Sequence, residues 1–301
     1  MGANLKTTES PLVFGTIAIS GVGLIGGSIG LAARHFGLAE RVIGIGRSPE
    51  KLQRAVQLGA IDDYSLDFAD ASCRCDMLYL ATPVGHIVRE LKALAGLPLR
   101  NGCVVTDGGS AKAQIVASAA SLGAGVYFVG GHPMAGLEQS GVEYASKDLF
   151  QGAAYILTPT RASNPDALQK MRSFALGMGS RVIELAPELH DKLIAASSHL
   201  PHVAAGAFLR VAQIAGLSSI RKIAAGSFRD LTRVADSSPE MWKDICLANR
   251  QELVQTLDDF SQALDEIRSI LQSEDEVALA EWFEAGQRLR QEIFRKEGGG
   301  Q

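Results

Sequence analysis

Six residues near the N-terminus have the spacing of a phosphate-binding turn. The segment Gly21-Val22-Gly23-Leu24-Ile25-Gly26 follows the apolar run TIAIS and precedes the helix-compatible segment SIGLAARHF. In such a strand–turn–helix unit the first glycine permits the tight turn, the second lets the backbone approach a pyrophosphate, and the third allows close packing of helix on strand. The helix N-terminus adds positive potential. The spacing therefore predicts dinucleotide contacts from Gly21, Gly23, Leu24, Ile25 and Gly26.

The residues after the second apolar run, VIGI, discriminate between cofactors. Proteins that bind NAD usually place an acidic residue there for the ribose 2′-hydroxyl, whereas this chain has Gly46-Arg47-Ser48. An arginine can pair with a 2′-phosphate and a serine can donate a hydrogen bond to it. We therefore expect NADP to be favoured over NAD, although Arg47 as an ordinary surface charge would leave NAD acceptable. Thr82 and Pro83, after the run MLYLA, are expected to touch the cofactor as well.

Two further runs are followed by residues that suit proton transfer. Ser110 lies in DGGSAK after CVVT, and His132 lies in GGHPMAG after VYFV. Imidazole titrates near neutrality, so a histidine beside a nicotinamide suits proton removal coupled to hydride loss. The alternatives are a helix N-cap for Ser110 and an uninvolved loop position for His132.

The last third of the chain carries the remaining polar groups. His199 and His202 lie three residues apart in SSHLPH, which would place them on one helix face. We expect no metal site there, because no acidic residue has a suitable spacing. Pro201 predicts a bent helix. Arg233, in FRDLTRVA, either clamps a substrate carboxylate or forms a weak surface ion pair with Asp230.

The elements that must position these groups follow from the apolar pattern. Short apolar runs, typical of buried parallel strands, alternate with helix-compatible segments, which predicts a doubly wound α/β sheet with some extra strands. The predicted strands are 16–20, 42–45, 77–81, 103–106, 126–129, 154–157 and 181–185. The predicted helices are 25–36, 49–58, 84–95, 111–122 and 165–177.

Glycine usage divides the chain near Pro187. Only seven of the 32 glycines lie beyond this residue, and glycine weakens helix interiors. We expect a disordered N-terminus (1–10), a dinucleotide-binding domain (11–186) and an all-helical domain (187–297). Apolar residues recur at alternating spacings of four and three from Leu253 to Leu271. This spacing predicts an apolar seam on a helix of about 30 residues that starts near Pro239. The seam favours a homodimer, with intramolecular packing on helices 188–215 and 276–296 as the alternative.

Composition excludes several classes of partner. The 301 residues carry a formal net charge of −4, whereas nucleic acid or an anionic membrane surface would attract a basic protein. No apolar run approaches the ~18 residues of a membrane span, and the first ten residues lack the apolar core of a secretory signal. The four cysteines form no C-x-x-C pair, which is typical of reduced thiols. We expect a cytoplasmic protein with no nucleic-acid or membrane partner.

Taken together, these segments resemble the TyrA family, the prephenate and arogenate dehydrogenases of tyrosine biosynthesis. The matching blocks, in family order, are GVGLIGGS, ATP, DGGSAK, GGHPMAGLEQSG, HDK, SSHLPH, FRDLTRVA and MWKDICLANR. The resemblance implies a Rossmann-type domain followed by a helical dimerisation domain, with the active site between them. It also implies oxidative decarboxylation of prephenate to 4-hydroxyphenylpyruvate, or of arogenate to tyrosine.

The resemblance further implies roles for single residues. His132 corresponds to the base that binds the ring hydroxyl, and Ser110 to the serine that supports it. Arg233 and His202 correspond to substrate-binding residues, and Glu138 to an acidic residue near the cleft mouth. From the short tail after Lys296 we expect no C-terminal regulatory domain. We expect prephenate, rather than arogenate, to be the substrate.

Two other classes share parts of this pattern. A β-hydroxyacid dehydrogenase also joins a dinucleotide-binding domain to a helical one, but would carry a catalytic lysine where this chain has SSHLPH. A non-enzymatic NADP-sensing protein would not need His132, His202 and Arg233 to converge.

Overall fold

The computed structural model describes residues 12–137 and 139–295. The expected disorder at 1–10 and the side chain of Glu138 lie outside these residues. The chain divides into two compact units, Met1–Arg250 and Gln251–Gln301. The predicted domain boundary near Pro187 falls inside the first unit, where it separates the last strand from the first of the C-terminal helices.

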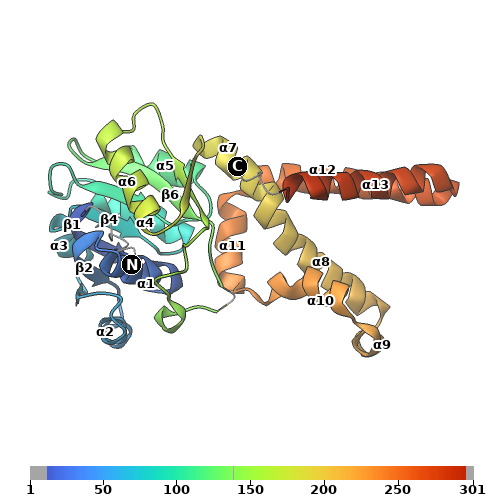
Figure 1. Cartoon of the computed structure of the whole chain (residues 1–301), viewed down its shortest axis with the longest axis horizontal. Helices are drawn as coiled ribbons and strands as arrows, with labels where there is room; N and C mark the ends of the chain where they lie inside the picture. The colour runs from blue at the N-terminus through green and yellow to red at the C-terminus, as the bar shows by residue number, and fades with distance from the viewer. Residues whose placement is uncertain (1–11, 138, 296–301) are drawn as a thin grey trace, which may run out of the picture. The chain divides into compact units, whose positions relative to one another are not determined.

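An eight-stranded sheet forms the centre of the N-terminal region (Figure 1), in the order β3-β2-β1-β4-β5-β6-β7-β8. The strands are β1 (Phe14–Ser20), β2 (Ala39–Ile45), β3 (Asp63–Ser65), β4 (Met77–Leu80), β5 (Val104–Asp107), β6 (Tyr127–Pro133), β7 (Ala154–Thr158) and β8 (Arg181–Glu184). The pairings from β3 to β6 are parallel, whereas β7 runs antiparallel to β6 and β8 parallel to β7. The prediction of a doubly wound parallel sheet with extra strands is confirmed.

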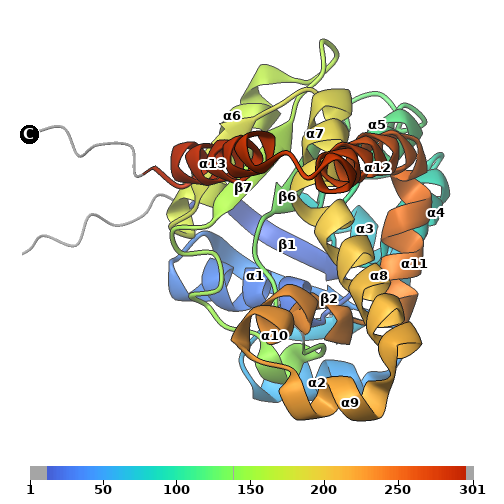
Figure 2. The same cartoon turned by 90° about the vertical axis from the view of Figure 1, so that its right-hand side faces the viewer.

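Within the described residues, six α-helices belong to this α/β region and seven follow it. The first six are α1 (Leu24–His35), α2 (Pro49–Gln57), α3 (Phe68–Cys73), α4 (Val84–Leu94), α5 (Ala113–Ala119) and α6 (Pro165–Gly177). The others are α7 (Pro187–Ile194), α8 (Leu200–Ala215), α9 (Leu217–Ile223), α10 (Gly226–Thr232), α11 (Pro239–Ala248), α12 (Arg250–Ser273) and α13 (Glu276–Ile293). The chain beyond β8 is thus helical throughout the described residues, as expected (Figure 2).

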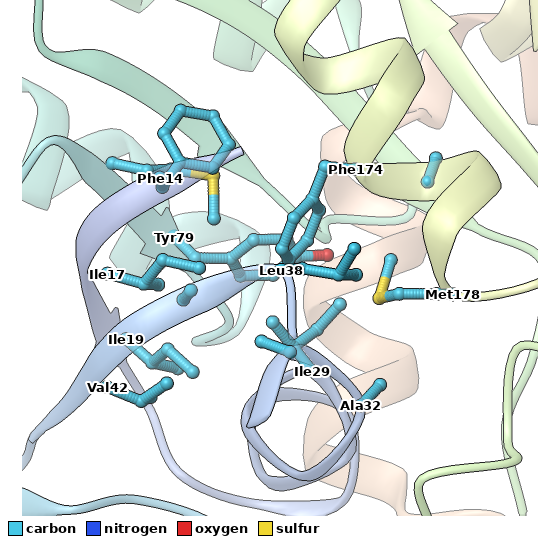
Figure 3. Packing of buried hydrophobic residues seen from close by; sticks show 14 of the residues in the cluster. Phe14, Ile17, Ile19, Ile29, Ala32, Leu38, Val42, Tyr79, Phe174 and Met178 are labelled. Carbon is cyan, nitrogen blue, oxygen red and sulfur yellow. The ribbon is translucent and has the colours of Figure 1, made fainter. Parts of the chain in front are cut away.

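Apolar layers cover both faces of the sheet. In β4, Met77 and Tyr79 belong to one buried cluster and Leu78 and Leu80 to the other. The first cluster packs α1 and α6 on the sheet, with Phe174 of α6 against the strands (Figure 3). A strand buried on both faces needs a continuous apolar run, and the run MLYL provides it.

The structure departs from the expected elements at three places. It adds β3 and α3, which are too short, at three and six residues, to show an apolar period. The single helix expected from Pro239 is wrong, because α11 ends at Ala248 and α12 begins at Arg250. The intervening Asn249 leaves helical geometry at φ −109° and ψ 29°, and its side-chain amide binds elsewhere in the fold.

A π-helical turn, Ala195–His199, joins α7 to α8 just before Pro201. Proline has no N–H and cannot continue the regular ladder, so a departure from α geometry is expected there. Among the described residues no single helix has both the length and the apolar composition to cross a membrane. Within the same part of the chain, one pair of helices, Pro187–Ala215 and Leu217–Ile223, meets the two criteria together, and it is bent by 110°.

Candidate active site

The glycine turn between β1 and α1 has the shape that an anion requires. Gly21 has φ +88°, and a Cβ there would lie 2.9 Å from the Ala81 carbonyl oxygen. A Cβ on Gly26 would lie 2.2 Å from the Gly21 oxygen, so a side chain would force helix and turn apart. Gly23 caps the helix without a side-chain bond and faces open space. The free first-turn N–H groups and this opening fit a pyrophosphate.

Two cavities border this turn. The larger, of about 810 Å³, is lined by Gly21 and by residues after β2 and β4. The smaller, of about 370 Å³, is lined by Leu24 and Ile25 at the start of α1. A ligand that crosses the glycine turn would therefore reach from one cavity towards the other.

The larger cavity brings together four of the predicted cofactor residues, Gly21, Arg47, Thr82 and Pro83. Arg89 of α4 and Lys243 of α11 line the same space, and sequence patterns did not indicate either. Ser48, which was also predicted to contact the cofactor, does not line the cavity. Its hydroxyl donates to Glu50 at 2.7 Å and accepts the Lys51 N–H at 3.3 Å, as an N-cap of α2.

Glu90 of α4 holds the two strand ends that frame this cavity. Its carboxylate accepts hydrogen bonds from the Ser20 hydroxyl at 2.5 Å and from the Thr82 hydroxyl at 2.7 Å. Since Ser20 ends β1 and Thr82 follows β4, this one side chain fixes the edge of the sheet where the turn begins. Nothing in the local sequence indicated this role.

The smaller cavity brings together His132, Ser110 and His202. His132 lies at the end of β6, Ser110 in the connection from β5 to α5, and His202 on α8. Val234 lines the cavity, whereas its neighbour Arg233 is exposed and does not. Burial lowers the pKa of the His202 imidazole, and the Arg233 charge acts in the same direction.

A buried hydrogen-bond chain runs from His132 away from the cavity. His132 Nδ1 lies 2.8 Å from His190 Nε2, and His190 Nδ1 lies 2.7 Å from Asp191 Oδ1. Asp191 also accepts the backbone N–H groups of Lys112 and Ala113, at 2.7 and 2.9 Å. These hydrogen bonds connect β6 to α7, and α7 to the start of α5.

The protonation states along this chain follow from its surroundings. Burial lowers the pKa of His132 well below its usual value, and the charges of His190 and Lys112 act in the same direction. Burial also lowers the pKa of His190, although its bond to Asp191 opposes this. Burial alone would raise the pKa of Asp191, but the hydrogen bonds from His190 and the backbone outweigh it, and the pKa is lowered. At neutral pH the two imidazoles are therefore neutral and the carboxylate is ionised.

Asp191 also explains why Ser110 is available to a ligand. The N-cap of α5 is Lys112, which makes no side-chain capping bond, and the Asp191 carboxylate takes over the capping of the first N–H groups. The alternative of Ser110 as N-cap is therefore wrong. Asp191 was visible in the sequence only as part of the HDK block, with no role attached.

A fully buried ion pair holds the loop that carries Ser110. Lys112 Nζ contacts Asp107 and donates to the Gly131 carbonyl oxygen at 2.7 Å. Asp107 in turn accepts the N–H groups of Gly109 and Gly131, at 2.8 and 3.2 Å. Both charged side chains have no exposed surface, so neither can be solvated if its partner is removed.

We expect Lys112→Met to lower the free energy of unfolding by about 3–5 kcal/mol, because the Asp107 carboxylate would stay buried and unpaired. The comparison is Lys147→Met, which removes an exposed pair with Asp148 and should cost no more than about 1 kcal/mol. Urea unfolding at one fixed protein concentration measures both. Equal losses in the two variants would show that the buried pair has no special importance. The double variant Asp107→Asn/Lys112→Met should recover part of the loss.

Aromatic packing and hydrogen bonding orient the two histidines from the SSHLPH block. The His202 ring stacks on Trp242 with centroids 3.6 Å apart and donates from Nδ1 to the Ser198 carbonyl oxygen at 2.9 Å. His199 Nδ1 accepts from the Asn249 side-chain amide at 3.1 Å. Among the described residues no three side chains of metal-binding type come together.

The comparisons with known proteins agree over nearly the whole chain. The profile described as prephenate dehydrogenase, nucleotide-binding domain, matches residues 29–184, and the one described as prephenate dehydrogenase, dimerization domain, matches residues 186–285. Prephenate dehydrogenase of Bacillus subtilis is 35% identical over 287 residues, which cover 94% of this chain and 77% of that protein. Cyclohexadienyl dehydrogenase of Zymomonas mobilis is 32% identical, covering 92% of this chain and 96% of that protein.

A solved structure gives the same result. Prephenate dehydrogenase from A. aeolicus, in complex with hydroxyphenyl propionate and NAD+, superposes with a TM-score of 0.86 at 34% identity, covering 93% of this chain and 98% of that one. The Rossmann-like sheet, the helical domain that follows it and these matches place the chain in the class of dinucleotide-dependent dehydrogenases. The chain belongs to the prephenate dehydrogenase family.

Proposed function

We propose that this protein oxidises and decarboxylates prephenate with transfer of a hydride to NADP. The observation that carries the proposal is the smaller cavity, where His132, Ser110 and His202 lie around one space that also touches the start of α1. Its volume of about 370 Å³ falls within the range of small-molecule sites. A sensor of the cofactor alone would not need these side chains beside the glycine turn.

The chain's own residues supply binding, orientation and a base. His132 takes the proton of the ring hydroxyl, which increases electron density on the carbon that carries it. A bound nicotinamide would supply the hydride acceptor for that carbon. Loss of CO₂ then makes the substrate ring aromatic, so the protein must mainly align the reactants and hold the base. Ser110 supports the hydroxyl, and Arg233 and His202 bind the rest of the substrate, with Arg233 on the side-chain carboxylate.

The lining of the smaller cavity supports prephenate over arogenate. Arogenate carries an ammonium group, which would call for a carboxylate nearby. Among the described residues that line the cavity there is no aspartate or glutamate, and Ser237 is the polar residue nearest to Asp236 in sequence. Glu138, which the family resemblance places near the cleft mouth, lies outside the described residues, and a role for it at the entrance stays a prediction.

Basic side chains around the larger cavity support NADP. Arg47, Arg89 and Lys243 line it together with Glu90, Glu240 and Asp244, and Lys243 is already paired with Glu240. The two arginines can pair with a 2′-phosphate, and the chain places no acidic residue directly after β2. Since the Ser48 hydroxyl donates to Glu50, we assign the phosphate contacts to the arginines. We likewise assign the pyrophosphate to the backbone of Gly21, Gly23, Leu24, Ile25 and Gly26, and further cofactor contacts to Thr82 and Pro83 at the edge of the sheet.

Arg47→Ala should raise the KM for NADP about 10–100-fold and leave the KM for NAD nearly unchanged, because hydrogen bonds to charged groups contribute about 1.5–3 kcal/mol. Initial rates with each cofactor at saturating prephenate measure this. Arg54→Ala is the matched control, since Arg54 is an exposed arginine on α2 outside the cavity. Equal effects on NADP and NAD would contradict the assignment of Arg47 to the 2′-phosphate.

A homodimer through the helical region is part of the proposal. On α8, Val211 and Ile214 are 64% and 88% exposed, and on α12, Leu264 and Leu271 of the predicted seam are 51% and 57% exposed. Apolar helix faces of this kind favour a partner. Light scattering after size exclusion should give twice the chain mass. The cytoplasmic location stays a prediction from the sequence.

A substrate panel tests the proposed function. Purified protein is offered prephenate, arogenate or a 3-hydroxyacid, each with NADP and with NAD, and cofactor reduction and CO₂ release are recorded together. We expect the highest kcat/KM with prephenate and NADP, with one CO₂ released per cofactor reduced. Reduction with the 3-hydroxyacid alone, or none with any substrate, would overturn the proposal.

A further inference from the structure

The hydrogen bonds that link His132 to His190 and His190 to Asp191 determine which nitrogen of His132 carries its proton. Asp191 is ionised and can only accept, so His190 must donate to it from Nδ1. A neutral imidazole that carries its proton on Nδ1 has a bare Nε2, which can only accept. The His132 Nδ1 that lies 2.8 Å from this nitrogen must therefore be the donor.

The same logic leaves His132 Nε2 without a proton. Nδ1 points to His190, and within the described residues Nε2 makes no hydrogen bond, while the residue itself lines the smaller cavity. The lone pair on Nε2 is thus the atom of His132 that a ligand can reach.

We propose that His190 and Asp191 are positioning residues that hold His132 in the tautomer with its proton on Nδ1, so that its Nε2 lone pair faces the substrate hydroxyl. This inference rests on the proposed function for the identity of the proton donor, but not for the tautomer itself. In the step, the substrate O–H bond breaks and an N–H bond forms at Nε2. The Nδ1 proton stays on His132, and Asp191 stays ionised and stabilises the imidazolium through His190.

Every charged or titratable group that faces the His132 ring is consistent with a neutral base before the reaction. Lys112 and Asp107, from β5 and its loop, form a pair with each other and with Gly131. His199, from the π-helical turn, is neutral at physiological pH, since burial lowers its pKa to about 4. The ionised Asp191 is linked to His132 by two successive hydrogen bonds through His190. It is the anion that stabilises His132 when this imidazole becomes positively charged.

The tautomer is directly measurable in the intact protein. The full-length protein, labelled with ¹⁵N in its six histidines, gives two-bond proton–nitrogen correlations that distinguish protonated from bare ring nitrogens. The His132 signals are assigned by their loss in His132→Asn. Near neutral pH we expect a protonated Nδ1 and a bare Nε2 on His132. A proton on Nε2, or similar amounts of both tautomers, would overturn the proposal whatever the substrate is.

A pair of variants tests whether the acceptor matters for turnover. Gln in place of His190 can present its amide oxygen where Nε2 stood and still accept from His132 Nδ1, whereas Leu cannot. We expect His190→Leu to lose about 10²-fold in kcat with little change in KM, and His190→Gln to retain most of the activity. Equal losses in both, or none in His190→Leu, would contradict the role.

Substitution at Asp191 is a weaker test, because an asparagine could keep its oxygen towards His190 and turn its amide nitrogen to the Ala113 N–H. Melting curves monitored by circular dichroism establish that each His190 variant is folded. If His190→Leu does not fold, the correlation spectrum of the wild-type protein and the activity of His190→Gln decide the question. In that case a large kcat loss in His190→Gln, with His132 still protonated on Nδ1, would contradict the proposal.

Discussion

His132→Asn is expected to lower kcat by roughly 10²–10⁴-fold, the usual contribution of a general base. The asparagine amide can replace the Nδ1–H that donates to His190, so the surrounding structure should persist, but nothing basic remains in place of Nε2. The variant lacks the proton acceptor but keeps the other residues that line the cavity. Steady-state rates with prephenate and NADP measure the loss.

The cofactor should bind His132→Asn as tightly as it binds the wild-type protein, because the glycine turn and the basic groups of the larger cavity are untouched. A fluorescence titration with NADPH measures this affinity. His35→Asn is the control, since His35 is exposed at the end of α1, where its ring meets Phe36. Near-normal turnover in His132→Asn would remove His132 from the mechanism.

Arg233→Ala is expected to raise the KM for prephenate about 10–100-fold and to change kcat much less. A guanidinium that binds a carboxylate contributes about 1.5–3 kcal/mol, and this contact is the same in the ground state and the transition state. Arg233→Lys should give an intermediate KM, because lysine keeps the charge but loses the planar fork.

The control for Arg233 is Arg229→Ala, which removes an exposed arginine about one helical turn earlier, in α10. It should leave KM within about threefold of the wild-type value, because the charge that acts on His202 of the cavity is that of Arg233, and an exposed charge without a specific contact contributes little. An unchanged KM in Arg233→Ala would contradict the clamp. A change as large in Arg229→Ala would show that general surface charge, not one contact, attracts the substrate.

Local patterns were sufficient to predict most of the sheet. The continuous run MLYL became β4, and the glycine spacing from Gly21 to Gly26 gave the turn between β1 and α1. Such features depend on a few adjacent residues, whose apolar period or backbone freedom is visible in the sequence. By contrast, β3 has only three residues, too few to show a period.

The interior of the site depended on contacts that no local pattern reveals. His132 and His190 are 58 residues apart, and the capping of α5 by Asp191 spans nearly 80. The break at Asn249 likewise coincides with a side-chain amide that donates to the Asp191 carbonyl oxygen, 58 residues away. For Ser110, the local reading as an N-cap was plausible, and only the position of Asp191 excluded it. Arg233 was assigned by resemblance, and in the structure its neighbour Val234 lines the cavity instead.

The pH dependence of kcat/KM tests most directly whether neutral His132 accepts the substrate proton. The base works only when unprotonated, and its pKa is lowered, so activity should stay level as the pH falls through about 6.5. It should decline only in more acidic solution, with an apparent pKa that belongs to His132 and His190 as a pair. We predict that this acidic limb disappears from the residual activity of His132→Asn. A limb centred above about 6.5, or the same limb in the variant, would contradict the account.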